Sequence, residues 1–459
     1  MKNNVNFLAF VVALGGFLFG YDTAIISGTI GFVKTQFNLS TIMEGWYVSC
    51  ALVGTILGVI IAGMVSDKYG RKNMLLISSL FFALSAIGCT FSISFNTLVI
   101  YRLLGGIGVG VASMLSPLYI SEIAPAKNRG RLVALYQLAI TVGILCAYFM
   151  NAYLLALSTS DFMANTTGIV RKVYVTEIWR SMLGSETIPA ILFLLLLLAI
   201  PKSPRWLASK GKLVKAKSIM QRFMSMEEAD KNIKEVQTIL SKDSAGIQSV
   251  LSGPFKLAML IGISLAFLSQ ISGINAIIYY GPRILEEGGL KLGDALGGQV
   301  VIGVVNVLFT FVALWKIDDL GRKPLLTYGI IGIMVSLISV GILFFLDVKN
   351  PYLLMTFILL FIACFAFSFG PVLWVLLSEI YPLKIRGAAM SIATMTVWIG
   401  TTFVGQMTPW LLENLKPFGT FWFFAGFMIP AIYLVIKVLP ETKGKSLEEI
   451  ENYWISKKN

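Results

Sequence analysis

Long apolar segments recur along the whole 459-residue chain, and they constrain its fold more than any other feature. Each run of roughly 18 to 25 residues, folded as a helix that rises about 1.5 Å per residue, can cross about 30 Å of hydrocarbon. With 56% hydrophobic and 13% charged residues, the chain carries more apolar side chains than a soluble core needs. The runs are continuous rather than alternating, which favours helices over a membrane β-barrel. The sequence therefore predicts an all-α integral membrane protein that is dissolved in a lipid bilayer.

The apolar runs divide into two sets of six, one within residues 1–200 and one within residues 254–439. Their expected spans are 7–32, 44–66, 74–94, 96–120, 130–155, 178–200, 254–285, 295–315, 324–346, 350–379, 387–412 and 417–439. Between the sets, residues 201–253 are basic and amphipathic, which predicts a helical cytoplasmic linker, and residues 440–459 form a polar cytoplasmic tail. We expect twelve transmembrane helices in two six-helix bundles.

The formal net charge of +13 would suit a nucleic-acid partner, but its distribution favours a topological origin. With both termini in the cytoplasm, most Lys and Arg residues fall on the cytoplasmic side, as the positive-inside rule requires. In the linker, Trp206, Leu207, Ile219 and Met220 could bury one helix face at the membrane surface. We therefore expect a multi-pass protein of the cell (inner) membrane with no nucleic-acid partner.

The sequence offers no pattern typical of an enzyme, an ATP-driven pump or a channel. It has no histidine, and its 4 cysteines lie in apolar segments without metal-type spacing, so no metal site is expected. It contains no P-loop and no selectivity filter or charge ring. We expect no catalytic residues and no cofactor, which leaves a secondary transporter as the favoured class.

Short charged motifs occur twice, at equivalent places in the two sets of helices. The second and eighth expected spans are each followed by an acid, a glycine and an arginine in the same register, and the fourth and tenth by S-E-(x6)-R-G. The charged residues concerned are Asp67, Arg71, Glu122, Arg129, Asp318, Arg322, Glu379 and Arg386. Carboxylates and arginines around a tight glycine turn can bridge neighbouring helices, so we expect cytoplasmic gates or latches here. The alternative is charge that only sets the topology.

These motifs carry a family resemblance that spans nearly the whole chain. Together with the segments 20–28 (GYDTAIISG) and 270–275 (QISGIN) and the Tyr279-Tyr280 pair, they resemble the sugar porter family of the major facilitator superfamily. Within that family, the chain looks nearest to the bacterial D-xylose/proton symporters. The resemblance implies the major facilitator fold, a small sugar as substrate and a proton as coupling ion. It also implies alternating access around a central sugar site, in a protein that is a monomer.

Three ionisable residues within the apolar spans are candidates for proton coupling. Because the chain has no histidine, a proton carrier inside the membrane must be a carboxylate. Counting about 1.5 Å per residue places Asp22, Arg102 and Glu186 roughly 8 to 12 Å below the outer surface. Asp22 could pair with Arg102 or accept a proton, and Glu186 could share that role. The alternative is a static buried ion pair in a passive facilitator, but the resemblance favours coupling, because facilitators of the family commonly have a neutral residue at this position.

Sugar recognition requires polar groups for the hydroxyls and aromatic faces for the ring, and the seventh span offers both. Gln270 and Asn275 lie about 140° apart on an unbroken helix, so they would not share a face. Gly273 between them is a candidate helix break, and discontinuous helices are where transporters build binding sites. The alternative is an amide pair that only holds helices together.

The family's sugar contacts, carried over by position, extend this candidate site to seven residues. They are Gln137, Gln270, Asn275, Tyr279, Asn306, Trp374 and Trp398. Ser269 stands where the family usually has Gln, and Val397 stands where xylose symporters have an amide. Both changes remove potential hydrogen bonds to a sugar, so the preferred substrate could be D-xylose or a similar pentose or hexose. Lys202 replaces the family's usual Glu after Pro201, which affects one expected latch.

Overall fold

The structure is a computed structural model, and the part of the chain that it describes is helical, with no strand. The described residues are 5–125, 129–222, 255–381 and 385–444, together with 226, 227, 229, 449, 450, 453 and 454. Within them, 12 helical segments are long and apolar enough to cross a membrane. This number confirms the prediction made from the apolar runs.

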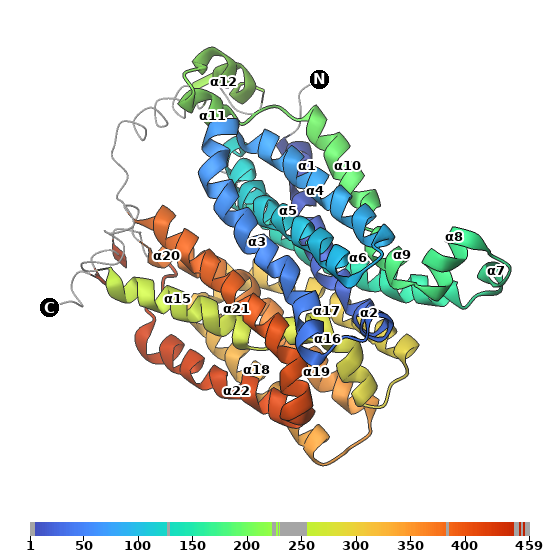
Figure 1. Cartoon of the computed structure of the whole chain (residues 1–459). Coiled ribbons are helices and arrows are strands. Elements are labelled where there is room, and N and C mark those ends of the chain that lie inside the picture. The colour runs from blue at the N-terminus through green and yellow to red at the C-terminus, as the bar shows by residue number, and fades with distance from the viewer. Residues whose placement is uncertain are drawn as a thin grey trace. The chain divides into compact units, whose positions relative to one another are not determined.

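Several of the spans are built from two helices rather than one (Figure 1). The spans of the first set consist of α1 (Val5–Ile25) with η1 (Ile26–Gly28), α3 (Thr41–Tyr69), α4 (Arg71–Phe91), α5 (Phe95–Ile123), α6 (Arg129–Ser158), and α9 (Trp179–Gly184) with α10 (Thr187–Ala199). Those of the second set consist of α15 (Lys256–Ile271) with α16 (Ile274–Glu287), α17 (Leu292–Leu320), α18 (Arg322–Phe345), α19 (Pro351–Phe367) with α20 (Phe369–Ile380), α21 (Arg386–Asn414), and α22 (Lys416–Tyr433) with η4 (Leu434–Val438). Shorter elements connect them, namely α2 (Ile30–Phe37), α7 (Asp161–Ala164), α8 (Gly168–Arg171), η3 (Lys172–Thr176), α11 (Pro204–Ser209) and α12 (Leu213–Met220).

The chain forms two compact units, each with its own helix packing. Unit 1 comprises Met1–Phe32 and Cys50–Asp243, and unit 2 comprises Val33–Ser49 and Ser244–Asn459. In unit 1, α1 packs along α6 and α4 packs along α5. In unit 2, α18 packs against α19 and α22, and α15 packs against α21. The division into bundles, linker 201–253 and tail 440–459 remains a prediction.

Two helix starts show how the sequence sets the element boundaries. At the start of α5, the Ser94 hydroxyl accepts from the Thr97 backbone NH at 3.3 Å, and Thr97 Oγ1 accepts from the Ser94 NH at 3.1 Å. At the start of α19, Asn350 Oδ1 accepts from the Leu353 NH at 3.1 Å, and Pro351 occupies the first turn. Both arrangements satisfy backbone donors that a helix end leaves without partners.

The repeated charged motif produces a repeated backbone turn. Gly70 joins α3 to α4 and Gly321 joins α17 to α18, and both glycines have a φ of 89°. Glycine reaches this region at little cost, whereas residues with a Cβ are strained there. The tight glycine turn expected from the sequence is therefore present in both units.

The linker helices pack on unit 1 itself. The amphipathic pattern of the linker predicts that the face with Trp206 and Leu207 lies at the membrane surface. In the structure, Trp206 is buried, its Nε1 donates to the Asp67 carbonyl oxygen at 3.0 Å, and its ring covers Gly70. The absence of a side chain on Gly70 leaves the room that the indole ring occupies. Most of the predicted linker after residue 222 lies outside the described residues.

Candidate functional site

The three predicted proton-coupling residues gather inside unit 1. Asp22 on α1 and Arg102 on α5 are each only 3% exposed, and Arg102 Nη1 lies 2.5 Å from Asp22 Oδ1. Glu186 is 2% exposed and interacts with both groups. A charge buried in this way needs a charged partner or a proton, so the three residues remain the candidate site for proton coupling.

A helix break brings Glu186 to this cluster. The apolar run predicts one helix over residues 178–200, but α9 ends at Gly184 and α10 begins at Thr187. The Tyr21 hydroxyl, next to Asp22 on α1, hydrogen-bonds to Ser185 at the break at 2.7 Å. Among the described residues, Glu186 Oε1 has no hydrogen-bond partner. A carboxyl group with one spare buried oxygen can take up a proton or a cationic partner.

In unit 2, a second helix break brings the two predicted amides together. Gly273, with a φ of 87°, separates α15 from α16, as its position between the two amides had indicated. Asn275 Nδ2 consequently donates to Gln270 Oε1 at 2.8 Å, which an unbroken helix would not allow. Gln270 Nε2 donates to the Ser269 hydroxyl at 3.0 Å. Ser269 therefore supports Gln270 from the position where the family usually has Gln.

The other predicted sugar contacts occupy four helices of unit 2 and one of unit 1. Tyr279 on α16, Asn306 on α17 and Trp398 on α21 are buried, and Trp374 on α20 is partly buried. Gln137 lies on α6 of unit 1 and is also partly buried. The role of all five in sugar binding remains a prediction.

Comparison with known proteins identifies the family. The family model for "Sugar (and other) transporter" matches residues 8–454. The chain is 39% identical over 443 residues to the arabinose-proton symporter of Bacillus subtilis, covering 96% of this chain and 93% of that protein. It is 37% identical over 480 residues to the D-xylose-proton symporter of Escherichia coli, covering 97% of this chain and 95% of that protein.

The chain belongs to the sugar transporter family. Its structure resembles that of the xylose transporter XylE from E. coli in a partially occluded inward-open conformation, with a TM-score of 0.83 and 35% sequence identity. The match covers 96% of this chain and 99% of that one. The predicted family and the major facilitator fold are therefore confirmed, and this sugar transporter is a multi-pass membrane protein.

The repeated charged motifs of this sugar transporter form matching clusters in the two units. In unit 1, Arg71 lies 2.7 Å from Asp67 and 3.0 Å from Glu122. In unit 2, Arg322 binds Glu379 through two hydrogen bonds of 2.8 and 3.1 Å. The side chains of Arg129, Asp318 and Arg386 lie outside the described residues.

Residues 201–205 (PKSPR) and 440–444 (PETKG), which follow the sixth span of each set, form a further repeated pair that extends the correspondence between the units. Ser203 donates to Glu122, and its counterpart Thr442 donates to Glu379 at 2.6 Å. Glu441, just before Thr442, accepts from the backbone NH groups of Arg322 at 3.2 Å and Lys323 at 3.0 Å, and so caps α18. The counterpart of Glu441 in unit 1 is Lys202, which cannot accept hydrogen bonds, so α4 lacks this cap.

Replacing Lys202 with Glu should therefore stabilise the transporter. The new carboxylate can cap the first turn of α4, and a capping interaction contributes about 1 kcal/mol. We expect a higher thermal unfolding temperature for the detergent-purified Lys202→Glu protein. Lys202→Met is the matched control, because it removes the cation without adding a hydrogen-bond acceptor. An equal rise in both variants would show that removal of the positive charge, and not capping, is responsible.

Glu441 should also make stability depend on pH. Burial alone would raise the pKa of its carboxyl, but hydrogen bonds from the backbone NH groups of Lys443, Lys323, Arg322 and Thr442 outweigh burial and hold the pKa below its usual range. The stabilisation is therefore fully present above the ordinary Glu pKa of about 4.3 and is lost as pH falls through the lower folded-state value. We expect Glu441→Gln to lower the unfolding temperature at pH 7 and to narrow its difference from wild type as pH falls below about 4. A difference that stays constant down to pH 3 would contradict this role.

Sequence reasoning missed a buried charged cluster in unit 2. Glu44, 1% exposed, accepts from Lys34 Nζ at 2.6 Å and from Arg283 Nη1 at 2.9 Å. Arg283 Nε also donates to Glu287 Oε1 at 3.1 Å. On α3, the helix that carries Glu44, the Ser49 hydroxyl donates to Gln406 Oε1 of α21 at 2.6 Å. An acid in the first turn of one apolar span and an arginine inside another are the signals that could have revealed the cluster.

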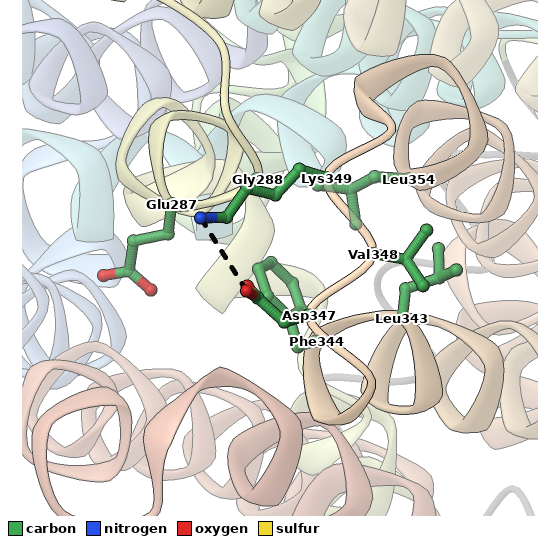
Figure 2. Close-up of a pocket in the computed structure, with 8 residues that line it drawn as sticks. All are labelled: Glu287, Gly288, Leu343, Phe344, Asp347, Val348, Lys349 and Leu354. Atoms are coloured by element: carbon green, nitrogen blue, oxygen red, sulfur yellow. Dashed lines mark ion pairs between the residues drawn. The ribbon is translucent and has the colours of Figure 1, made fainter.

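A shallow pocket in unit 2 is distinct from the predicted sugar residues (Figure 2). It encloses about 260 Å³, part of which is open solvent, and an ion pair of 3.7 Å between Asp347 and Lys349 lies at its edge. Its lining residues are Glu287, Gly288, Leu343, Phe344, Asp347, Val348, Lys349 and Leu354. None of them is a predicted sugar contact, so this pocket does not represent the candidate sugar site.

Proposed function

We propose that this transporter imports a monosaccharide together with a proton by alternating access. The observation that carries the proposal is the buried cluster of Asp22, Arg102 and Glu186 in unit 1. The relatives named as arabinose-, xylose- and galactose-proton symporters support the same activity. The coupling ion is the proton, with no further cofactor.

Proton coupling would arise from competition for the Asp22 carboxylate. When Asp22 is ionised, Arg102 neutralises it at 2.5 Å. When a proton neutralises Asp22 instead, Arg102 loses this partner, and the neighbouring carboxylate of Glu186 is placed to receive it. With both carboxylates ionised, the cluster carries one negative charge in excess of the single charge of Arg102. Uptake of one proton by Asp22 cancels that excess and leaves Arg102 paired with Glu186, and release of the proton restores it.

Sugar recognition would rest on the amide pair at the α15–α16 break. Gln270 and Asn275 can hydrogen-bond to hydroxyls, and Tyr279, Trp374 and Trp398 supply aromatic surface for the ring. We assign Asn306 and Gln137 as further polar contacts to the sugar. The names of the relatives favour a pentose such as L-arabinose or D-xylose as the substrate, with D-galactose as the hexose to compare.

The topology and assembly follow from charge and family. The basic linker and the charged clusters at the glycine turns would lie in the cytoplasm, together with both termini, because positive charge is retained on that side. The clusters of Arg71 with Glu122 and of Arg322 with Glu379 would act there as latches of the transport cycle. The transporter would work as a monomer without catalysing a reaction.

Medium pH provides the direct test. Lightly buffered, de-energised cells that express the chain receive D-xylose, L-arabinose, D-galactose or D-glucose in turn. Alkalinisation of the medium with one sugar would establish both proton symport and the substrate. Entry of labelled sugar without a pH change would instead identify a passive facilitator, in which Asp22 and Arg102 form a structural ion pair. Cells without the protein serve as the control.

A further inference from the structure

One turn of α21, at Gly400 and Thr401, lies directly against Gln270. A Cβ added to Gly400 would lie 3.0 Å from Gln270 Cβ and 3.4 Å from Gln270 Cγ, so the missing side chain gives the glutamine stem its room. Thr401 is 4% exposed, and its hydroxyl donates to Gln270 Oε1 at 3.0 Å.

The hydrogen bonds around Gln270 fix which atoms its amide can offer to a ligand. Oε1 accepts from Asn275 Nδ2 at 2.8 Å and from Thr401 Oγ1 at 3.0 Å, which together occupy both acceptor sites of a carbonyl oxygen. Nε2 donates one hydrogen to Ser269 at 3.0 Å, and an amide nitrogen carries two. In this orientation, Gln270 presents an N–H donor, and a sugar hydroxyl next to it must act as an acceptor.

The Thr401 hydroxyl has a second acceptor within reach. It lies 2.9 Å from the carbonyl oxygen of Val397, one helical turn earlier on α21. A hydroxyl carries a single hydrogen, so it can satisfy Gln270 or Val397 but not both at once. The bond to Gln270 therefore forms when the Thr401 hydroxyl turns away from Val397, and in that arrangement Gln270 Oε1 is occupied while its second N–H hydrogen stays available to a ligand.

We propose that Thr401 is a positioning residue for the sugar, which holds the Gln270 amide so that its N–H group faces a sugar hydroxyl. This role rests on the proposed function and extends it to the direction of one hydrogen bond in the site. Preorganisation of a binding group lowers the cost of ordering it when the ligand arrives. Thr401 should therefore affect sugar affinity rather than the rate of the transport cycle.

The test compares three variants of the detergent-purified full chain, titrated with D-xylose and with L-arabinose by calorimetry. Thr401→Val keeps the shape but loses the hydroxyl, and we expect the dissociation constant to rise about three- to tenfold. Thr401→Ser retains the hydroxyl and should restore affinity. Thr402→Val is the matched control, because among the described residues the Thr402 hydroxyl donates to Trp398 of its own helix. In proteoliposomes, the maximal exchange rate of Thr401→Val should stay within about twofold of wild type.

The outcomes separate this inference from the proposed function. Wild-type affinity in Thr401→Val, or equal weakening in Thr402→Val, would overturn the positioning role while sugar transport stands. If the wild-type protein binds neither these two sugars nor D-galactose or D-glucose, both proposals fail.

A second measurement needs no variant and so does not depend on whether Thr401→Val folds. Each hydroxyl of D-xylose is replaced in turn by hydrogen or by fluorine, which can accept a hydrogen bond but cannot donate one. At the hydroxyl facing Gln270, the wild-type protein should bind the fluoro sugar more tightly than the deoxy sugar. Absence of this preference at every position would refute the donor orientation.

Discussion

Uphill sugar accumulation should disappear when Asp22 is replaced with Asn, while exchange of sugar across the membrane persists. Asn has nearly the shape of Asp but cannot be protonated or carry a negative charge. The proton and Arg102 can therefore no longer compete for a carboxylate at this position. Arg102 would then depend on Glu186 for charge compensation. Without a proton carrier, the sugar gradient can no longer draw on the proton gradient, and the accumulation ratio should fall to unity.

Two assays on Asp22→Asn separate coupling from sugar binding. Accumulation of labelled sugar in energised cells measures coupling, and counterflow in proteoliposomes measures sugar exchange without a proton gradient. Asp319→Asn is the control, because Asp319 is an exposed acid whose side chain is 63% accessible. Accumulation that survives in Asp22→Asn would remove Asp22 from the coupling mechanism. Loss of both accumulation and counterflow would point to a structural role for the ion pair with Arg102.

Replacing Glu44 with Ala should destabilise the transporter strongly. Glu44 is the common partner of Lys34 and Arg283, and its own side chain is 1% exposed. The substitution removes two charge-assisted hydrogen bonds to a buried carboxylate, each of which contributes about 1.5–3 kcal/mol. Lys34 and Arg283, with side chains 40% and 30% exposed, remain accessible to water, which limits the loss. We expect a marked fall in the thermal unfolding temperature of the detergent-purified protein.

The same arginine provides a matched control for Glu44. Glu287 also pairs with Arg283, at 3.1 Å, but its side chain is 33% exposed. A solvent-accessible pair of this kind contributes about 0–1 kcal/mol, so Glu287→Ala should change the unfolding temperature little. Equal effects of Glu44→Ala and Glu287→Ala would show that burial does not determine the contribution of these two carboxylates.

The amino-acid sequence alone was sufficient to predict the membrane architecture and the family. The apolar runs gave the number of membrane-crossing segments, because only helices of this length satisfy the backbone in lipid. The depth count along three helices predicted that Asp22, Arg102 and Glu186 share one level. In the structure, Arg102 pairs with Asp22, and Glu186 lies near enough to interact electrostatically with both. Counting works here because the rise of a regular helix is constant.

Helix breaks were only partly visible in the sequence. Gly273 indicated the break between α15 and α16, since glycine alone tolerates that backbone conformation well. The break at Ser185 and Glu186 directly follows Gly184, but this glycine has no positive φ, and tertiary contacts such as the bond between Tyr21 and Ser185 accompany the break. The helix propensities of the residues in one helix contain no information about which side chain of another helix they contact.

What the sequence determined about this protein is the set of local, periodic properties: the twelve spans, the repeated glycine turns, the ionisable residues inside lipid-length helices and the motifs of the sugar transporter family. Only the tertiary structure decided that Thr401 would hold Gln270, that Glu44 would join Lys34 to Arg283, and that Trp206 would cover Gly70 rather than lie on the membrane surface. These contacts join residues of different helices or loops. Their geometry depends on how helices rotate and approach one another, and a hydrophobic pattern that is apolar on every face leaves that rotation unspecified.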